Sequence, residues 1–308
     1  MTFVQDELQR AADELFGGRT GPLTLTELAE LGWDELVAEE PELAVGTLAE
    51  AQGRHRGSSR IVELEMDRVL GVDPVAGALG LPWQGTTLTA STADVLLLAD
   101  AAAAPSVLVP VMTGDEVTLC PLQPSTLTAV PVGGVDAEAG FTRVTGTIDP
   151  DGRRTVPPGT WAGAVAAGRL ALSHELIGVG QAMLNLAVHH VTDRTQFGVA
   201  LGTFQAVQHR LADVHVDLEA ARAIARTAWI NGDPSLAAAA HLAAGRALDT
   251  ATGHCHQVMG AIGCTWEHDM HRFIRRGLLL GVLLTADDST WVALVQSARS
   301  SERVELFG

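Results

Sequence analysis

The 308-residue sequence contains no lysine, so all 20 of its basic residues are arginines, and they face 37 Asp and Glu residues. The formal net charge is −17, and a field of that sign repels phosphate backbones and anionic membrane surfaces. We therefore do not expect a general nucleic-acid binder. We interpret the missing lysine as a compositional bias of the source genome and not as chemistry.

Cysteine is scarce as well. The three cysteines, Cys120, Cys255 and Cys264, cannot form a disulfide framework in a chain of this length, and their odd number fits a reducing compartment. The first ten residues, MTFVQDELQR, are polar and acidic where a secretory signal has a basic start and an apolar stretch. We expect a cytoplasmic protein.

Long apolar runs are missing too. Residues 95–112 are interrupted by Asp100, Pro105 and Pro110, and residues 277–284 are too few to span a bilayer. We expect no membrane anchor. Hydrophobic residues make up 47% and charged residues 19%, which is ordinary usage for a globular protein and excludes disorder along the whole chain.

Three types of sequence pattern follow one another along the chain. From residue 5 to about 71, apolar residues recur at helical spacing in LQRAADELF, LTELAELGWDELVAEE and RIVELEMDRVLG, with expected breaks at Gly17, Gly18, Pro41 and Gly53. From about 81 to 156, the β-branched runs TTLTAST, SVLVPVM, EVTLCPL, STLTAVPV and FTRVTGTI predict short, antiparallel strands.

Beyond residue 157 the sequence predicts long helices over 164–194, 203–230 and 235–259, a glycine-rich turn over 260–263, and further helix from about 267. Gly232 suits a helix end, and Asp233 before Pro234 suits a cap and a first turn. The predicted fold is α+β and mainly α. We expect an N-terminal helical domain (1–80), a middle β-domain (81–156) and a C-terminal bundle (157–308) of four or five helices.

Two patterns that suggest ligands are rejected on spacing. Among the 11 histidines, His254 and His256 stand two apart and face different sides of a helix, and His268 with His271 lacks a third and a fourth ligand, so we expect no metal site. The run Gly178-Val179-Gly180 resembles the start of a dinucleotide fingerprint, but no strand precedes it and no third glycine follows.

More specific signals stand at two predicted helix junctions: RTQFG from Arg194, then Phe204-Gln205, and QVMGAIG from Gln257. Arginine can bind a phosphate with two hydrogen bonds, glycines let backbone N–H groups approach a pyrophosphate, and a helix start favours an anion. Taken alone, an ordinary helix end with a surface Arg or Gln remains the simpler interpretation of each segment.

Taken together, these segments resemble a known family. The stretch DRTQFG…FQAVQHRLADV…ARAIARTAW…QVMGAIGCTWEHDMHRFIRR is similar, in order and spacing over residues 160–300, to the C-terminal domain of acyl-CoA dehydrogenases. LAELGWDELVAEE and LAEAQGRHRGSSRI resemble the family's N-terminal helices in shortened form. The resemblance implies a three-part subunit that binds FAD between two subunits.

The resemblance also assigns cofactor contacts. It implies that seven residues touch the ADP half of an FAD held mainly by the neighbouring subunit; we call them the clamp residues, and they are Arg194, Phe197, Phe204, Gln205, Gln257, Gly260 and Ala261. Ala261 stands where the family usually has a second glycine.

The family's reaction removes an α-proton from an acyl thioester while a hydride moves from the β-carbon to the flavin, so it needs a carboxylate base. The resemblance places Leu284 at the usual Glu and Gly168, before Arg169, at a second known location. Neither residue accepts a proton, so we expect no catalytic residue in this chain. The nearest acids are Asp287 and Glu175.

The middle region departs from the family as well. Residues 81–156 contain neither the family's Thr-Glu-x-x-Gly-Ser-Asp loop nor its aromatic-Ile-Thr strand, which hold the isoalloxazine. The resemblance is therefore to the non-catalytic short subunit of α2β2 acyl-CoA dehydrogenases, which some actinobacteria use on bulky CoA thioesters such as steroid side chains. It implies a catalytic partner subunit that holds the acyl-CoA substrate, with an electron-transfer flavoprotein as the acceptor.

Two alternatives stay open. One is a homomeric flavoenzyme whose base has moved to Asp287 or Glu175. The other is a structural or regulatory protein on a dehydrogenase-like scaffold.

Overall fold

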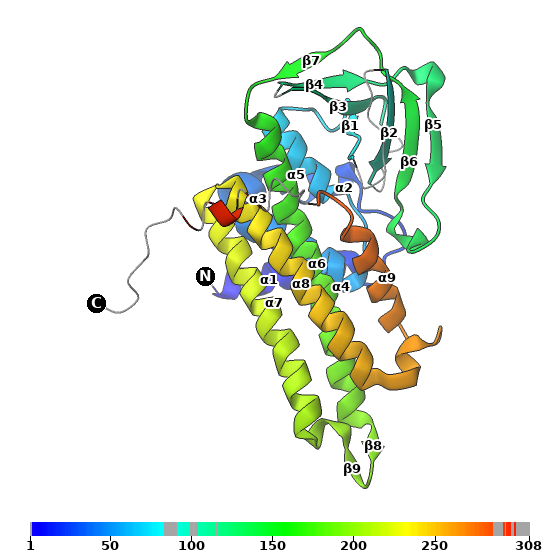
Figure 1. Ribbon diagram of the computed structural model, residues 1–308, viewed down its shortest axis with the longest axis vertical. Coiled ribbons are helices and arrows are strands. Elements are labelled where there is room, and N and C mark those ends of the chain that lie inside the picture. The colour runs from blue at the N-terminus through cyan, green and yellow to red at the C-terminus, as the bar shows by residue number, and fades with distance from the viewer. Residues whose placement is uncertain are drawn as a thin grey trace, which may run out of the picture.

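The computed structural model describes residues 2–82, 91–98, 101, 104–114 and 116–285, with a few more between 292 and 299. The helices of the first part are α1 (Thr2–Phe16), α2 (Leu25–Glu30), α3 (Trp33–Glu39), α4 (Pro41–His55) and α5 (Ile61–Leu70). Those of the last part are α6 (Thr160–Asp193), α7 (Gln205–Asn231), α8 (Pro234–Met259) and α9 (Met270–Leu280). The strands between the two helical parts gather at one end of the molecule, and α6, α7 and α8 run side by side toward the other (Figure 1). The predicted mainly helical α+β fold is confirmed.

The strands between the two helical parts form two small sheets. They are β1 (Ala78–Leu79), β2 (Thr92–Leu97), β3 (Val107–Thr113), β4 (Glu116–Pro121), β5 (Thr128–Pro131), β6 (Thr142–Thr147) and β7 (Arg154–Val156). One sheet has the order β1-β3-β4-β7 and the other β2-β6-β5. The described pairs are antiparallel except for β1 with β3, which is parallel. Most of the predicted TTLTAST strand lies outside the described residues.

Helix ends follow the sequence signals at several places. Pro41 is the first residue of α4, and Gly232 ends α7 in the left-handed region at φ 64°. Asp233 caps α8 by accepting a hydrogen bond from Ser235 N at 2.8 Å. The predicted helix over residues 25–40 divides into α2 and α3 because Gly32 takes φ 69° between them.

The predicted break at Gly53 is wrong, because α4 continues to His55. The glycine serves packing instead: a Cβ there would lie 2.2 Å from Glu175 O of α6. The contact is reciprocal, since a Cβ on Gly178 of α6 would lie 2.1 Å from Glu50 O of α4. The two helices therefore meet backbone to backbone, and only glycine fits at either position.

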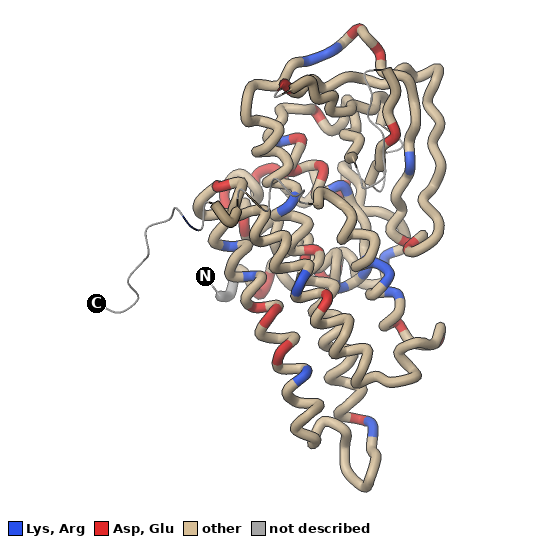
Figure 2. The backbone as a smooth tube through the Cα atoms, in the orientation of Figure 1, with Lys and Arg blue, Asp and Glu red and all other residues tan. Residues whose placement is uncertain are grey.

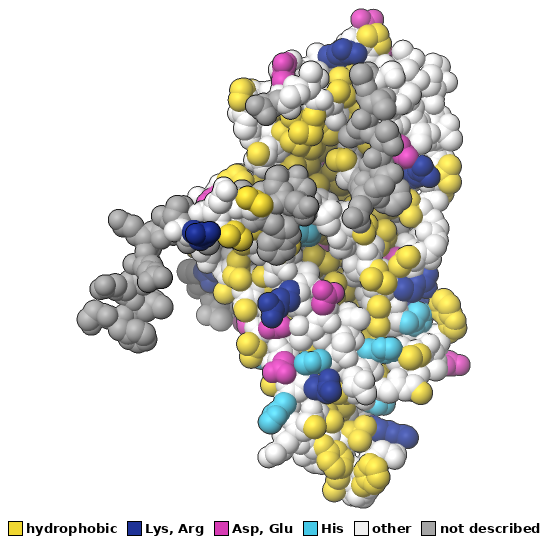
Figure 3. Space-filling model, viewed as in Figure 1, with side chains coloured by type: hydrophobic (Ala, Val, Ile, Leu, Met, Phe, Trp, Pro, Cys, Tyr) yellow, Lys and Arg dark blue, Asp and Glu magenta, His cyan; other side chains and the backbone are white. Residues whose placement is uncertain are grey.

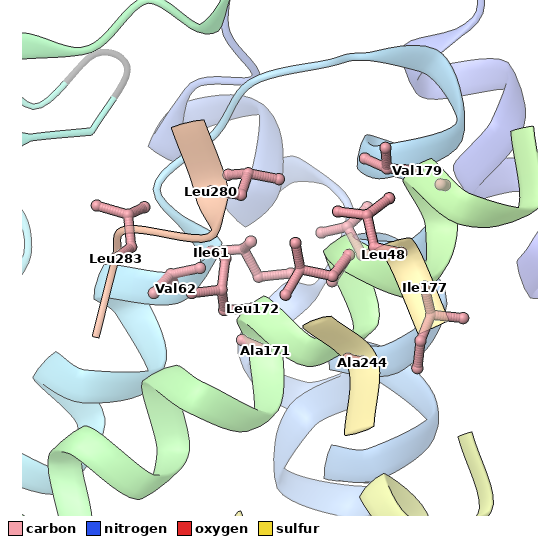
Figure 4. Packing of buried hydrophobic residues seen from close by; sticks show 14 of the residues in the cluster. Leu48, Ile61, Val62, Ala171, Leu172, Ile177, Val179, Ala244, Leu280 and Leu283 are labelled. Atoms are coloured by element: carbon pink, nitrogen blue, oxygen red, sulfur yellow. The ribbon is translucent and has the colours of Figure 1, made fainter. Parts of the chain in front are cut away.

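This contact places α6 at the centre of the molecule. α6 packs against α4, α5, α7, α8 and α9, and a Cβ on Gly180 would lie 2.7 Å from Leu218 of α7. Figure 4 shows Leu48 of α4, Ile61 of α5, Leu172 of α6 and Ala244 of α8 gathered between these helices. The glycines that resembled a dinucleotide motif are thus packing positions of a buried helix.

Charged residues of both signs are spread along the chain. In Figure 2, acidic and basic positions are interspersed over the described part of the chain. Within that part, no helix combines the length and apolarity needed to cross a membrane.

We predict that Gly178→Ala lowers the free energy of unfolding by about 3 kcal/mol, because a methyl group must push apart two backbones that cannot yield locally. Urea unfolding followed by circular dichroism measures this. The matched control is Gly245→Ala in α8, where a Cβ would meet no atom within 4 Å. The control should stabilise the chain by about 0.5–1 kcal/mol through helix propensity. Equal stability of Gly178→Ala and the wild type would contradict the backbone contact.

Candidate functional site

The two positions that the resemblance assigns to the family's base, Gly168 and Leu284, come together in space. Gly168 lies in the third turn of α6 and Leu284 follows α9. A Cβ on Gly168 would lie 2.8 Å from Leu284 Cδ1 and 2.8 Å from Met66 Cγ of α5. We call Met66, Gly168 and Leu284 the apolar plug. Two alternative base positions, 116 residues apart in sequence, therefore share one small volume filled with apolar atoms.

Leu284 is held firmly in this volume. Its backbone is in the left-handed region at φ 49°, which a leucine adopts only where its surroundings impose it. The Arg169 guanidinium donates to Leu284 O at 2.8 Å and to Thr285 O at 3.2 Å. Leu284 is 7% exposed and Met66 is fully buried, so the apolar plug is part of the core.

Glu175, one of the two acids considered as a relocated base, lies about 10 Å further along α6. Its side chain is buried, and the Arg276 guanidinium approaches it, with Nη1 3.7 Å from Oε1. Burial raises the pKa of Glu175 to about 7, although Arg276 and Gln52 act in the opposite direction. The other acid, Asp287, lies outside the described residues.

Arg276 connects Glu175 to three other parts of the chain. It is 1% exposed, and its Nε donates to Asp136 Oδ2 at 2.5 Å. Its terminal nitrogens donate to Gly57 O at 2.6 Å and Arg56 O at 3.1 Å. Glu175 therefore belongs to a buried ion-pair network, which joins α6, α9, the α4–α5 connection and the strand region.

The first group of clamp residues surrounds a small hairpin at the far end of α6. Arg194 ends α6, and the strands β8 (Thr195–Gln196) and β9 (Val199–Ala200) follow. Phe197, at the hairpin tip, has φ 54° and is 92% exposed. Its ring lies edge-on to that of Phe204, with the centroids 6.3 Å apart. Gln205 is the first residue of α7 and is exposed.

The second group of clamp residues follows the end of α8. Gln257 is exposed in the last turn, Gly260 ends the helix at φ 63°, and Ala261 is exposed in the next turn. His254 Nδ1 lies 3.0 Å from Arg210 O, so the end of α8 is tied to the start of α7. Both groups thus lie at one end of the bundle, beside the β8–β9 hairpin (Figure 1).

This end of the bundle also exposes apolar side chains, of which Phe197 and Phe204 are clamp residues and Val199 was not named in the sequence analysis. We define the hairpin-end patch as Phe197 (92% exposed), Val199 (44%) and Phe204 (38%). Ile262 (44%) and Trp266 (75%) are exposed separately after α8, where the Trp266 ring packs on the Arg275 guanidinium. Apolar side chains gather at the corresponding end of the space-filling view (Figure 3). Ile262 and Trp266 lie within five residues after the Gln257–Ala261 segment. This closeness in sequence is the signal from which they could have been found. Exposed apolar patches of this kind mark sites of protein contact.

Within the described residues, no cluster of three or more His, Cys, Asp or Glu side chains has a metal-binding arrangement. The dense histidine segment instead contains one close pair, with His256 Nε2 3.1 Å from Cys264 Sγ.

Comparison with known proteins places this chain in a family. Residues 161–283 match the family described as "Acyl-CoA dehydrogenase, C-terminal domain". The acyl-CoA dehydrogenase IpdE2 of Mycobacterium tuberculosis is 30% identical over 295 residues, which cover 87% of this chain and 89% of that protein. FadE34 of the same organism is 40% identical over 121 residues, which cover 37% of this chain and 17% of that protein. The chain belongs to the acyl-CoA dehydrogenase family.

Solved structures share the fold over nearly the whole chain. The steroid acyl-CoA dehydrogenase described as "Tcur3481-Tcur3483 steroid ACAD G363A variant" has a TM-score of 0.72 and 21% identity, and covers 97% of this chain and 99% of that chain. The ChsE4-ChsE5 complex from Mycobacterium tuberculosis has a TM-score of 0.70 and 17% identity, and covers 97% of this chain and 98% of that chain. The predicted family and fold are confirmed.

We predict that Glu175→Gln removes a pH dependence of stability. The pKa of Glu175 is about 7 in the folded chain, against an ordinary value of 4.5, so its contribution to stability is fully present below about pH 4.5. That contribution is lost as the pH rises through 7. Between pH 5 and pH 8, the variant should therefore gain on the order of 2 kcal/mol relative to the wild type.

Urea unfolding at several pH values measures this gain. Glu219→Gln, at an exposed Glu of α7, is the control and should show no such trend. Parallel pH profiles of wild type and Glu175→Gln would contradict the buried placement.

Proposed function

We propose that this chain is the non-catalytic subunit of a heteromeric, FAD-dependent acyl-CoA dehydrogenase. The observation that carries the proposal is the apolar plug. At the two alternative positions that the resemblance gives for the family's base, Gly168 and Leu284 pack against each other and against Met66. None of these three side chains accepts a proton, so we infer that a base on another chain removes the α-proton of the thioester.

The clamp residues fit an FAD dinucleotide tail. All seven are exposed at one end of the bundle, and a Cβ on Gly260 would meet no atom within 4 Å, which leaves its backbone open to a ligand. Arg194 would pair with a phosphate, Phe197 and Phe204 would offer apolar ring surface, and Gln205 and Gln257 would supply amide hydrogen bonds. When bound, the flavin supplies the hydride acceptor of the reaction.

The distance along α6 favours a clamp that serves another subunit. Gly168 and Arg194 are 26 residues apart on one continuous helix, which corresponds to about 39 Å. A cofactor tail held at the hairpin end is thus remote from the apolar plug of the same chain. We infer that the ring of that cofactor lies in a pocket of the partner subunit, and that the hairpin-end patch faces that partner.

The names of two structures with the same fold support a heteromeric assembly and a steroid-like substrate. One structure of the same fold is described as a steroid acyl-CoA dehydrogenase and another as a complex of two differently named proteins. We propose a bulky acyl-CoA, such as a steroid side-chain thioester, in the partner's pocket, and an electron-transfer flavoprotein as the acceptor. We retain the domain division 1–80, 81–156 and 157–308 and a cytoplasmic location as parts of this proposal.

We predict that Arg194→Ala weakens FAD retention by the complex about ten- to hundredfold, because a hydrogen bond from a charged group contributes about 1.5–3 kcal/mol. The measurement is the flavin-to-protein ratio during dialysis of the two chains produced together, starting from one flavin per pair of unlike chains. Arg226→Ala is the matched control, since Arg226 is an exposed arginine near the opposite end of α7, paired with Glu42.

Each alternative function has its own outcome in this experiment. A lone chain that is yellow and bleaches on addition of an acyl-CoA would establish a homomeric flavoenzyme. A chain that takes up no flavin in any combination would establish a structural or regulatory protein. Equal flavin loss from Arg194→Ala and Arg226→Ala would remove Arg194 from the clamp.

A further inference from the structure

The turn after α8 brings a cysteine against a histidine. The helix ends at Gly260, and residues 260–264 fold back in a short 3₁₀ helix. A Cβ on Gly263 would lie 3.0 Å from His256 Cδ2 and 3.0 Å from Met259 Cβ, so a glycine is what lets the turn close on the imidazole. As a result, Cys264 Sγ lies 3.1 Å from His256 Nε2.

We propose that Cys264 is a nucleophilic thiol, with His256 as its proton acceptor, and that it exchanges with disulfides of small thiols. The thiolate is the reactive form of cysteine, and a base within hydrogen-bond distance is the arrangement that generates it. His256 lies in the last turn of α8, and its Nε2 faces Cys264 Sγ. The inference does not depend on the proposed function.

The other two cysteines provide an internal contrast. Cys120 and Cys255 are both buried, whereas Cys264 is exposed. Burial raises the pKa of Cys255 to about 12 and also raises the pKa of Cys120. Both buried groups therefore remain thiols near neutral pH, and reaction is confined to Cys264.

The reaction balances without a further oxidant. His256 Nε2 takes the proton of the Cys264 thiol as Sγ attacks one sulfur of the incoming disulfide. A new bond forms between Sγ and that sulfur, the old S–S bond breaks, and the leaving thiolate recovers the proton from the imidazolium. The products are a mixed disulfide on Cys264 and one free small thiol.

The test uses the purified full chain and dithiodipyridine, a neutral aromatic disulfide whose released thiopyridone is coloured. One thiol of the three should react in a fast phase, and peptide mass spectrometry should assign that phase to Cys264. Cys264→Ser should abolish the fast phase. A fast phase that maps to Cys120 or Cys255, or a Cys264 that reacts no faster than a peptide of the same local sequence, would overturn the proposal.

Variants of the histidine test its role. His256→Gln should slow the fast phase about tenfold. This is less than a positioned base contributes in an enclosed active site, because at an exposed position water can also accept the proton of the thiol. His254→Gln is the control, since the His254 ring faces Arg210 O, and it should leave the rate unchanged. Imidazole added in solution should restore the rate of His256→Ala and leave the wild-type rate unaltered, which a purely structural role of His256 would not produce. An unchanged rate in His256→Gln, or no rescue of His256→Ala, would remove the histidine from the site.

Discussion

The structure depends on the backbone contact between α4 and α6. Gly53 and Gly178 lie against Glu175 O and Glu50 O at distances that no Cβ would allow. The two helices therefore cannot slide or rotate against each other without a clash, because backbone atoms have no alternative rotamer to adopt. This constraint fixes the rotation of α6 about its axis. That rotation places Gly168 against Met66 and Leu284, and Glu175 against Arg276.

The same helix pair holds two buried acids with opposite behaviour. Glu50 accepts hydrogen bonds from Arg222 at 3.0 and 2.9 Å and faces His174, and these contacts outweigh burial and lower its pKa to about 2. The nearest cation to Glu175 is Arg276, at 3.7 Å, and that arginine is already engaged by Asp136 and two backbone carbonyls. Gln52 adds a hydrogen bond but no charge. Burial then dominates and raises the pKa of Glu175 to about 7. We interpret Glu175 as a structural group, because a base for a thioester must reach a cavity and this carboxyl is enclosed by its own network.

Local signals predicted most helix ends, because capping interactions act within a few residues. Gly232 ends α7 in a left-handed conformation that glycine adopts readily, and the Asp233 side chain caps the start of α8. Gly53 misled the prediction because the reason for that glycine lies on another helix. The sequence located the clamp residues as two separate segments, but their common position at the hairpin end depends on the lengths of three helices. Met66 could not be assigned to the apolar plug, because no local pattern links α5 to residue 284.

The apolar plug differs from a site that has merely lost its carboxylate. Removal of a side chain alone leaves a cavity, and cavities in a core destabilise the chain. Here Leu284 and Met66 lie where a side chain on Gly168 would begin, and Arg169 holds the backbone of Leu284 in a conformation that leucine otherwise avoids.

A glutamate at position 168 would need room that does not exist, because a Cβ there would already lie 2.8 Å from Leu284 and Met66. It would also bury a charge among apolar groups, where an unpaired carboxylate is strongly disfavoured. Lack of room thus excludes a glutamate at position 168, and burial of the charge disfavours one at position 284. The clamp residues, in contrast, are exposed at the hairpin end, where no such packing obstructs them.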